Sequence, residues 1–200
     1  MLAWRAWNLD WQRPPAALAD EEREYAGQMK FFDSHDSKAI VRLRALVKGI
    51  QWPPLSAFEA ECHAEEPKEH TVPTLGCTCG VWSFRSLRQA IVTIEHASHL
   101  HALGGVDHPD VAVVGAVALW GRMVVCTQGY RAQYAYPRSL YVLEKSFYFR
   151  DFHKKGHAEA AAARLSRDYN VPAEVVTWEQ LWNLSILDRD VPRETVAPTN

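Results

Sequence analysis

The chain has 200 residues, of which 48% are hydrophobic and 23% are charged, and its formal net charge is −2 at pH 7. This length and composition predict a single globular domain with its own core. The small net charge excludes a protein that attracts nucleic acid or an anionic membrane through its overall field. We expect no membrane association, because no apolar run is long enough for a transmembrane helix and the N-terminus lacks the pattern of a signal peptide.

The first fifty residues predict one strand followed by two helices. Between Leu2 and Trp11, apolar residues occupy both even and odd positions, which indicates a strand with contacts on both faces. Ala16 to Met29 contains D-E-E-R-E and predicts a solvated helix. Helix-capping residues at 33–37 precede apolar residues at helical spacing between Ile40 and Ile50, so we expect a second helix there. A strand over Ala39 to Val47 is the competing interpretation.

The middle of the chain predicts two short strands and a long helix. We expect Phe58 to Cys62 to form a short strand that leads into a polar loop, and Val81 to Phe84 to pair with it. Ser86 to Leu103 carries an apolar stripe at helical spacing, which predicts the clearest helix of the chain. The glycine pair that follows should end this helix.

Val111 to Val125 is the strongest strand signal, because it is apolar almost throughout and should be buried on both faces. Gly115 and Gly121 within it indicate a bulge or a close approach of backbone. Tyr130 to Leu143 should return antiparallel after a turn. Pro137 restricts this return strand to an edge or a bulge, because proline has no N–H to donate.

The C-terminal part predicts two helices, over His157 to Asp168 and over Ala173 to Leu184. Residues 186–200 are charged and proline-rich and are expected to form a flexible tail after a single domain at 1–185. The fold class is therefore predicted as α+β, with a mainly antiparallel, curved sheet and flanking helices. A small PUA-like barrel is one form that such a sheet can take, and this analogy carries no function.

Four potential metal ligands lie within eighteen residues, in the loop predicted at 60–82. They are Cys62, His70, Cys77 and Cys79. Thiolate and imidazole are the ligands that hold Zn²⁺ tetrahedrally, and a C-x-C pair fits a reduced, cytoplasmic metal site better than a disulfide framework. Gly80 and Gly76 should let the backbone turn on either side of the pair. We therefore expect bound zinc, although the common C-x₂-C spacing is absent and buried free cysteines are the alternative.

Two points about this cluster stay open from the sequence. His63 could replace His70, and Cys126 could replace Cys62 or either histidine. Three protein ligands and an open position would make the site catalytic, whereas four would make it structural. The predominance of soft sulfur ligands favours a structural site.

A second candidate surface follows the central hairpin, where aromatic and arginine side chains alternate. Its members are Trp120, Arg122, Tyr130, Arg131, Tyr134, Tyr136 and Arg138. Aromatic rings beside arginines can stack bases or bind a phosphate or carboxylate. Ordinary cross-strand packing with arginine stems along apolar surface explains the same pattern, and half-buried aromatic residues are normal on strands.

Short motifs across positions 52–142 resemble one group of proteins. The motifs are W-P-P at 52–54, A-E-C at 60–62, C-T-C-G at 77–80 and A-L-W-G-R-M-V…G-Y-R-A-Q-Y-A-Y-P from Ala118. This combination is similar to a group of short actinobacterial and phage proteins for which no activity is established. The resemblance therefore implies no function, fold or cofactor.

Three functional hypotheses follow from the sequence. The first is a non-enzymatic, zinc-stabilised binding module that recognises a nucleic acid or a protein partner through the tyrosine–arginine strand. The second is a metal-dependent hydrolase with an open zinc position and Glu61, Glu65 or Glu66 as base. The third is a phage or host regulatory protein that acts by protein–protein binding. No Walker loop, dinucleotide fingerprint or H-E-x-x-H motif points to another chemistry.

Overall fold

The structure is a computed structural model of the chain, and it describes all residues except 13–39, 47–49, 64–69, 105–111, 145–155 and 189–200. The described part contains seven strands and three helices. The strands are β1 (Leu2–Gln12), β2 (Ile40–Ala45), β3 (Phe58–Glu59), β4 (Val81–Phe84), β5 (Ala112–Val125), β6 (Gly129–Leu143) and β7 (Ala173–Val176). The helices are α1 (Leu87–Gly104), α2 (His157–Tyr169) and α3 (Trp178–Leu187).

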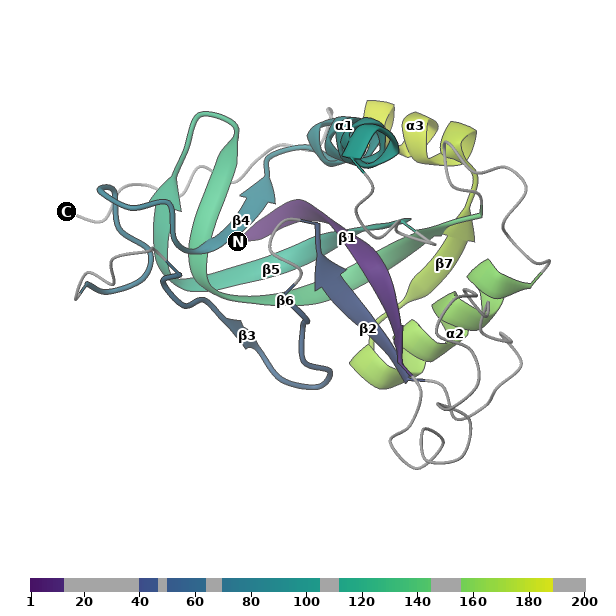
Figure 1. The fold of residues 1–200 in the computed structure, drawn as a ribbon, viewed down its shortest axis with the longest axis horizontal. Coiled ribbons are helices and arrows are strands. Elements are labelled where there is room, and N and C mark those ends of the chain that lie inside the picture. Colours follow the sequence, from purple (N-terminus) through teal and green to yellow (C-terminus); the bar gives the residue numbers. More distant parts are fainter. Residues whose placement is uncertain (13–39, 47–49, 64–69, 105–111, 145–155, 189–200) are drawn as a thin grey trace.

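All seven strands belong to one curved sheet built around the long β5–β6 hairpin (Figure 1). β1 pairs with β5, β2 pairs with β1, and β3 and β4 pair with β6, all antiparallel; only β7 runs parallel to β6. This arrangement confirms the predicted α+β class and the mainly antiparallel sheet. β1 and β4 meet at the single pair Trp4↔Phe84, so we describe the sheet as curved and not as a barrel.

Helices cover the two faces of the sheet, as Figure 1 shows: α1 and α3 lie together on one side, and α2 lies near β2 and β7. The two cores follow the alternation of side chains along β5. Val113, Val117 and Leu119 join the core under α2, whereas Ala112 and Val114 join the core under α1 and α3. The predicted burial on both faces is confirmed for Ala112 to Leu119, whereas the strand is exposed from Trp120 to Arg122.

The β5–β6 hairpin contains two register shifts, near Ala116 and between Trp120 and Met123. Pro137 lies at the first shift, which confirms its predicted place at a bulge. Gly121 lies at the second and has a positive φ of 74°. A Cβ at Gly115 would collide with the Ser139 carbonyl oxygen, so this glycine marks the predicted close approach of backbone.

One predicted helix is a strand, and the helix predicted over Ala173 to Leu184 begins only after a short strand. Ile40–Ala45 pairs with β1, and its buried residues alternate with half-buried ones, as in the competing strand interpretation. Ala173–Val176 adds parallel to β6, and α3 begins after it with a capping box at Thr177 and Gln180. Both segments are short and mixed in character, so pairing with a neighbouring strand decides their state. The helix expected at 16–29 and the capping residues at 33–37 lie outside the described residues.

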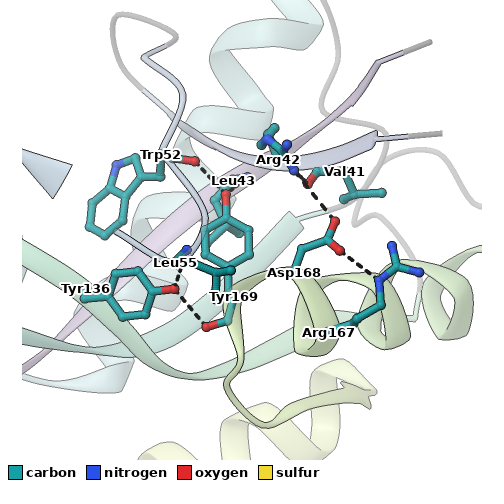
Figure 2. A network of polar contacts seen from close by, with 9 residues as sticks. All are labelled: Val41, Arg42, Leu43, Trp52, Leu55, Tyr136, Arg167, Asp168 and Tyr169. Carbon is teal, nitrogen blue, oxygen red and sulfur yellow. Dashed lines mark hydrogen bonds and ion pairs between the residues drawn. The ribbon is translucent and has the colours of Figure 1, made fainter. Parts of the chain in front are cut away.

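A chain of hydrogen bonds through two tyrosines joins β2, β6 and α2 (Figure 2). The Tyr169 hydroxyl donates to the Trp52 carbonyl at 2.7 Å and accepts from the Leu43 N–H at 3.0 Å. The Tyr136 hydroxyl donates to the Tyr169 carbonyl at 2.8 Å and accepts from the Leu55 N–H at 2.9 Å. These bonds position the segment around Trp52, which forms one wall of the cavity described below.

Among the described residues, no helix has the length and apolar character needed to cross a membrane.

The C-terminal tail predicted from residue 186 is partly ordered, because α3 continues through Leu187. Asp188 then binds back: its carboxylate accepts from the Leu87 N–H at the start of α1 and from the indole of Trp4. The remainder of the predicted tail, 189–200, lies outside the described residues.

Candidate metal centre

The four predicted metal ligands converge from segments next to two strands. Cys62 follows β3, and Cys77 and Cys79 precede β4, with His70 between them in the chain. Because β3 and β4 both pair with β6, the two cysteine segments are brought to one end of the sheet. Their ligand atoms all lie within 4.8 Å of one another.

Two distances within this cluster are close to those between ligand atoms of a tetrahedral metal site. The Sγ atoms of Cys62 and Cys77 are 3.7 Å apart, and two sulfurs bound tetrahedrally at about 2.3 Å from Zn²⁺ would be roughly 3.8 Å apart. His70 Nε2 lies 3.2 Å from the Sγ of Cys79, slightly closer than the roughly 3.6 Å of a sulfur–imidazole edge in such a site. All four cysteines of the chain are free thiols, so no disulfide competes for these sulfurs.

Gly80 lets the chain turn directly after Cys79, as predicted. Its φ is +113°, and a Cβ there would lie 2.9 Å from Cβ of Pro73 and 3.1 Å from Cβ of Arg131. Both the backbone conformation and the space therefore require glycine. Gly76 has an ordinary φ and nothing within 4 Å of an added Cβ, so the turn does not depend on it.

Arg131 is buried beneath the loop and binds its backbone. The guanidinium donates to the carbonyl of Cys77, to that of Cys79 at 3.0 Å and to that of Thr74 at 3.1 Å. The side chain is only 5% exposed. Three loop carbonyls bound to one side chain fix the path of the C-x-C segment.

The pKa values of the two cysteines of the C-x-C pair are shifted in opposite directions. A hydrogen bond from the Cys79 backbone is the main cause that lowers the pKa of Cys77. Burial is the main cause that raises the pKa of Cys79. A metal ion would hold both as thiolates, since a coordinating thiol is deprotonated. The burial of Cys79 would then be offset by coordination.

Cys126 and His63, the alternative ligands, are not part of this cluster. Cys126 sits in the turn between β5 and β6, where its Sγ faces the Val124 carbonyl at 3.9 Å, and its own carbonyl accepts from Arg85. His63 lies beside the cluster and lines the neighbouring cavity. Neither belongs to the group of mutually close ligand atoms in the described part of the chain.

The structure separates the members of the tyrosine–arginine set. Arg131 is buried under the loop that carries Cys77 and Cys79 (the metal loop). The Tyr136 hydroxyl is hydrogen-bonded to Tyr169. Tyr130 is half-buried, and the guanidinium of Arg85 lies over its ring. Trp120 and Tyr134 remain together as a stacked pair with ring centroids 6.0 Å apart. Trp120, Arg122 and Arg138 are exposed. The set therefore does not form one continuous surface.

A cavity of about 460 Å³ adjoins the metal centre. Cys62, Cys77 and Cys79 form part of its wall, together with Arg5, Trp52 and Trp82. Sequence reasoning missed Arg5 and Trp52 as site residues. The available signal was the W-R-A-W segment at 4–7, in which a cation stands inside an otherwise apolar strand.

No family model, curated protein or solved structure matches the chain.

Proposed function

We propose that the protein is a non-enzymatic binding module whose fold is stabilised by zinc at Cys62, His70, Cys77 and Cys79. The mutual approach of these four ligand atoms to within 4.8 Å carries the proposal. Four protein ligands, three of them sulfur, are typical of a closed structural site. The ion would join the ends of two short strands that share only a few pairs with β6.

Elemental analysis of the purified protein, with the variants Cys77→Ser and Cys79→Ser, tests the zinc site. We expect one zinc per chain in the wild type and little in either variant. Cys126→Ser is the matched control, since this cysteine lies outside the cluster, and it should keep its zinc. Full retention of metal in both test variants would remove the basis for the proposed site.

A partner would meet the module at the exposed end of the β5–β6 hairpin. Trp120 is 41% exposed and stacks on Tyr134, and Arg122 is exposed nearby. Aromatic rings of this kind stack nucleobases at a gain of roughly 1–3 kcal/mol each, and a neighbouring arginine can bind phosphate. Nucleic acid is therefore the first partner to test, with a cytoplasmic protein partner as the alternative.

Binding of a fluorescent single-stranded oligonucleotide at several salt concentrations tests this surface. We expect affinity to fall steeply as salt rises, because bound phosphates release counterions, and to fall on Trp120→Ala. The control is Trp182→Ala, because this ring packs against the core under α1 and α3 and beneath Arg88, and is not part of the Trp120–Tyr134 stack. An affinity that changes neither with salt concentration nor on Trp120→Ala would contradict a nucleic-acid partner. Proteins that co-purify with the chain would then be the next partners to test, including a phage or host regulatory target.

One observation keeps a metal-dependent hydrolase as the second candidate. Three of the four ligands and Glu61 line the cavity, so an ion with an open position would face a space where substrate could lie and a carboxylate could act as base. X-ray absorption of the zinc-loaded protein separates the two functions. A first shell of sulfur and nitrogen alone supports the binding module, and a bound water oxygen supports the hydrolase.

A further inference from the structure

The cavity lies at a gap along one edge of β1. On this edge β2 pairs with β1 from Trp7 to Gln12, and β4 pairs with it only at Trp4. Within the described chain, no strand pairs with Arg5 or Ala6 on this edge, and both residues line the cavity. The metal loop and the segment around Trp52 form the other walls. The space is therefore built by strands that diverge, with a volume in the range of small-molecule sites.

Aromatic rings form much of the wall. Trp52 is fully buried and stacks on Phe58, with ring centroids 5.1 Å apart and planes 13° apart. Trp82 lines the cavity from β4 and is 49% exposed. Its indole N–H donates to the Thr78 carbonyl at 2.8 Å, which positions the ring next to the metal loop. A flat, apolar body in this cavity would lie against aromatic rings, of which Trp82 has the more exposed surface.

Arg5 is the cation of the cavity, and within the described part of the chain it forms no ion pair with an acidic residue. Its guanidinium lies 5.1 Å from the centroid of Trp52 and donates to the Trp82 carbonyl. Its Nε is buried with no acceptor among the described residues. Glu61, the acidic residue that lines the cavity, is exposed and forms no ion pair with Arg5.

Burial lowers the pKa of Arg5 to about 10, which still leaves the side chain charged at neutral pH. A cation held among aromatic rings without a counter-charge is costly unless an anion joins it. An anion that reaches it gains a charge-assisted hydrogen bond in a medium that screens charge poorly.

We propose that this cavity binds a small organic anion, whose carboxylate or phosphate pairs with Arg5 and whose flat apolar body lies against Trp52, Phe58 and Trp82. The site is separate from the exposed Trp120–Tyr134 stack and does not depend on a nucleic-acid partner there. It shares with the zinc centre the wall formed by Cys62, Cys77 and Cys79.

Three matched probes test the proposal on the zinc-loaded full chain: 1-naphthaleneacetate, its uncharged amide and 1-naphthylmethylphosphonate. Calorimetry measures their affinity, and NMR of the tryptophan indoles locates them. We expect the acetate or the phosphonate to bind at least about tenfold more tightly than the amide, as for a hydrogen bond to a charged group. The anion that binds more tightly shows whether the site prefers a carboxylate or a phosphate-like group. Equal affinity of anion and amide, or no binding by any probe, would overturn the proposal.

Arg5→Met keeps an unbranched apolar stem and removes the guanidinium with its charge, and it should abolish the preference for the anion. Arg167→Met is the matched control, because the Arg167 side chain is 66% exposed on α2, forms an ion pair with its neighbour Asp168 and does not line the cavity. Zinc content is measured for each sample. Lost anion preference with zinc retained supports the role of Arg5, whereas an unchanged preference in Arg5→Met contradicts it. A zinc-free wild type would instead contradict the metal centre, so the two failures are distinguishable.

Discussion

The guanidinium of Arg131 donates to the carbonyl of Cys79 across 3.0 Å, so a buried side chain of the central hairpin holds the backbone of the metal loop. Arg131→Met should lower zinc affinity by about 10–100-fold, as expected when a group that orients metal ligands is removed. It should also destabilise the fold by at least about 1–3 kcal/mol, because buried carbonyls lose their donor. Competition with a chromogenic chelator and thermal unfolding measure the two effects.

Arg138→Met is the control for that experiment, since Arg138 is an exposed arginine on the same strand. It should leave zinc affinity unchanged. If Arg131→Met kept the zinc affinity of the wild type, the hydrogen bonds to Cys77 and Cys79 would have no part in shaping the metal site.

Two glycines that flank the C-x-C pair should respond differently to the same change. Gly80→Ala places a Cβ at a positive φ and 2.9 Å from Pro73, so we expect a loss of about 2 kcal/mol or more in the free energy of unfolding. Gly76→Ala meets open space and should be neutral. Denaturant unfolding of the two variants, each with its zinc content, measures the difference. Similar stability of both would show that the turn at Gly80 can be made with a side chain.

Removal of the metal should loosen one end of the sheet before the other. Chelation is expected to lower the midpoint of thermal unfolding and to raise amide exchange at 70–84, because structural zinc contributes directly to folding. α2 lies away from the metal loop beside β2 and β7 (Figure 1), so its amides should stay protected. Uniform exchange over the whole chain would mean that zinc supports the entire domain and not the loop alone.

Tyr169 should make the protein sensitive to alkaline pH. Burial, as the largest cause, raises the pKa of its phenol to about 12 from a usual value of 10. The folded chain then retains a proton that the unfolded chain loses, so the free energy of unfolding falls as pH rises from about 10 to about 12. Its contribution is fully present below pH 10. Tyr169→Phe should reduce this alkaline loss, measured by unfolding across the same pH range.

At neutral pH, the same substitution should cost about 1–3 kcal/mol, because the Leu43 N–H and the Trp52 carbonyl would be left buried without their partner. An unchanged pH profile together with unchanged neutral stability would contradict the network drawn in Figure 2.

Sequence patterns predicted the central part of the fold well because their signal is local. An uninterrupted apolar run identified β5, and the proline and glycines marked irregularities of the hairpin that the register shifts confirm. Ile40–Ala45 was misassigned because its apolar residues fit both a helical and an alternating spacing over six residues. Only the pairing with β1 removes that ambiguity.

The sequence by itself determined which residue types could hold a metal and where the buried central strands run, because ligand chemistry and hydrophobic periodicity are properties of short segments. The tertiary structure decided which of these residues meet. It brings His70 to Cys79 and leaves Cys126 in a distant turn. It turns Arg131 beneath the loop and exposes Arg5 to a cavity. These relations depend on strand pairs between residues far apart in the chain, and local spacing contains no information about such pairs.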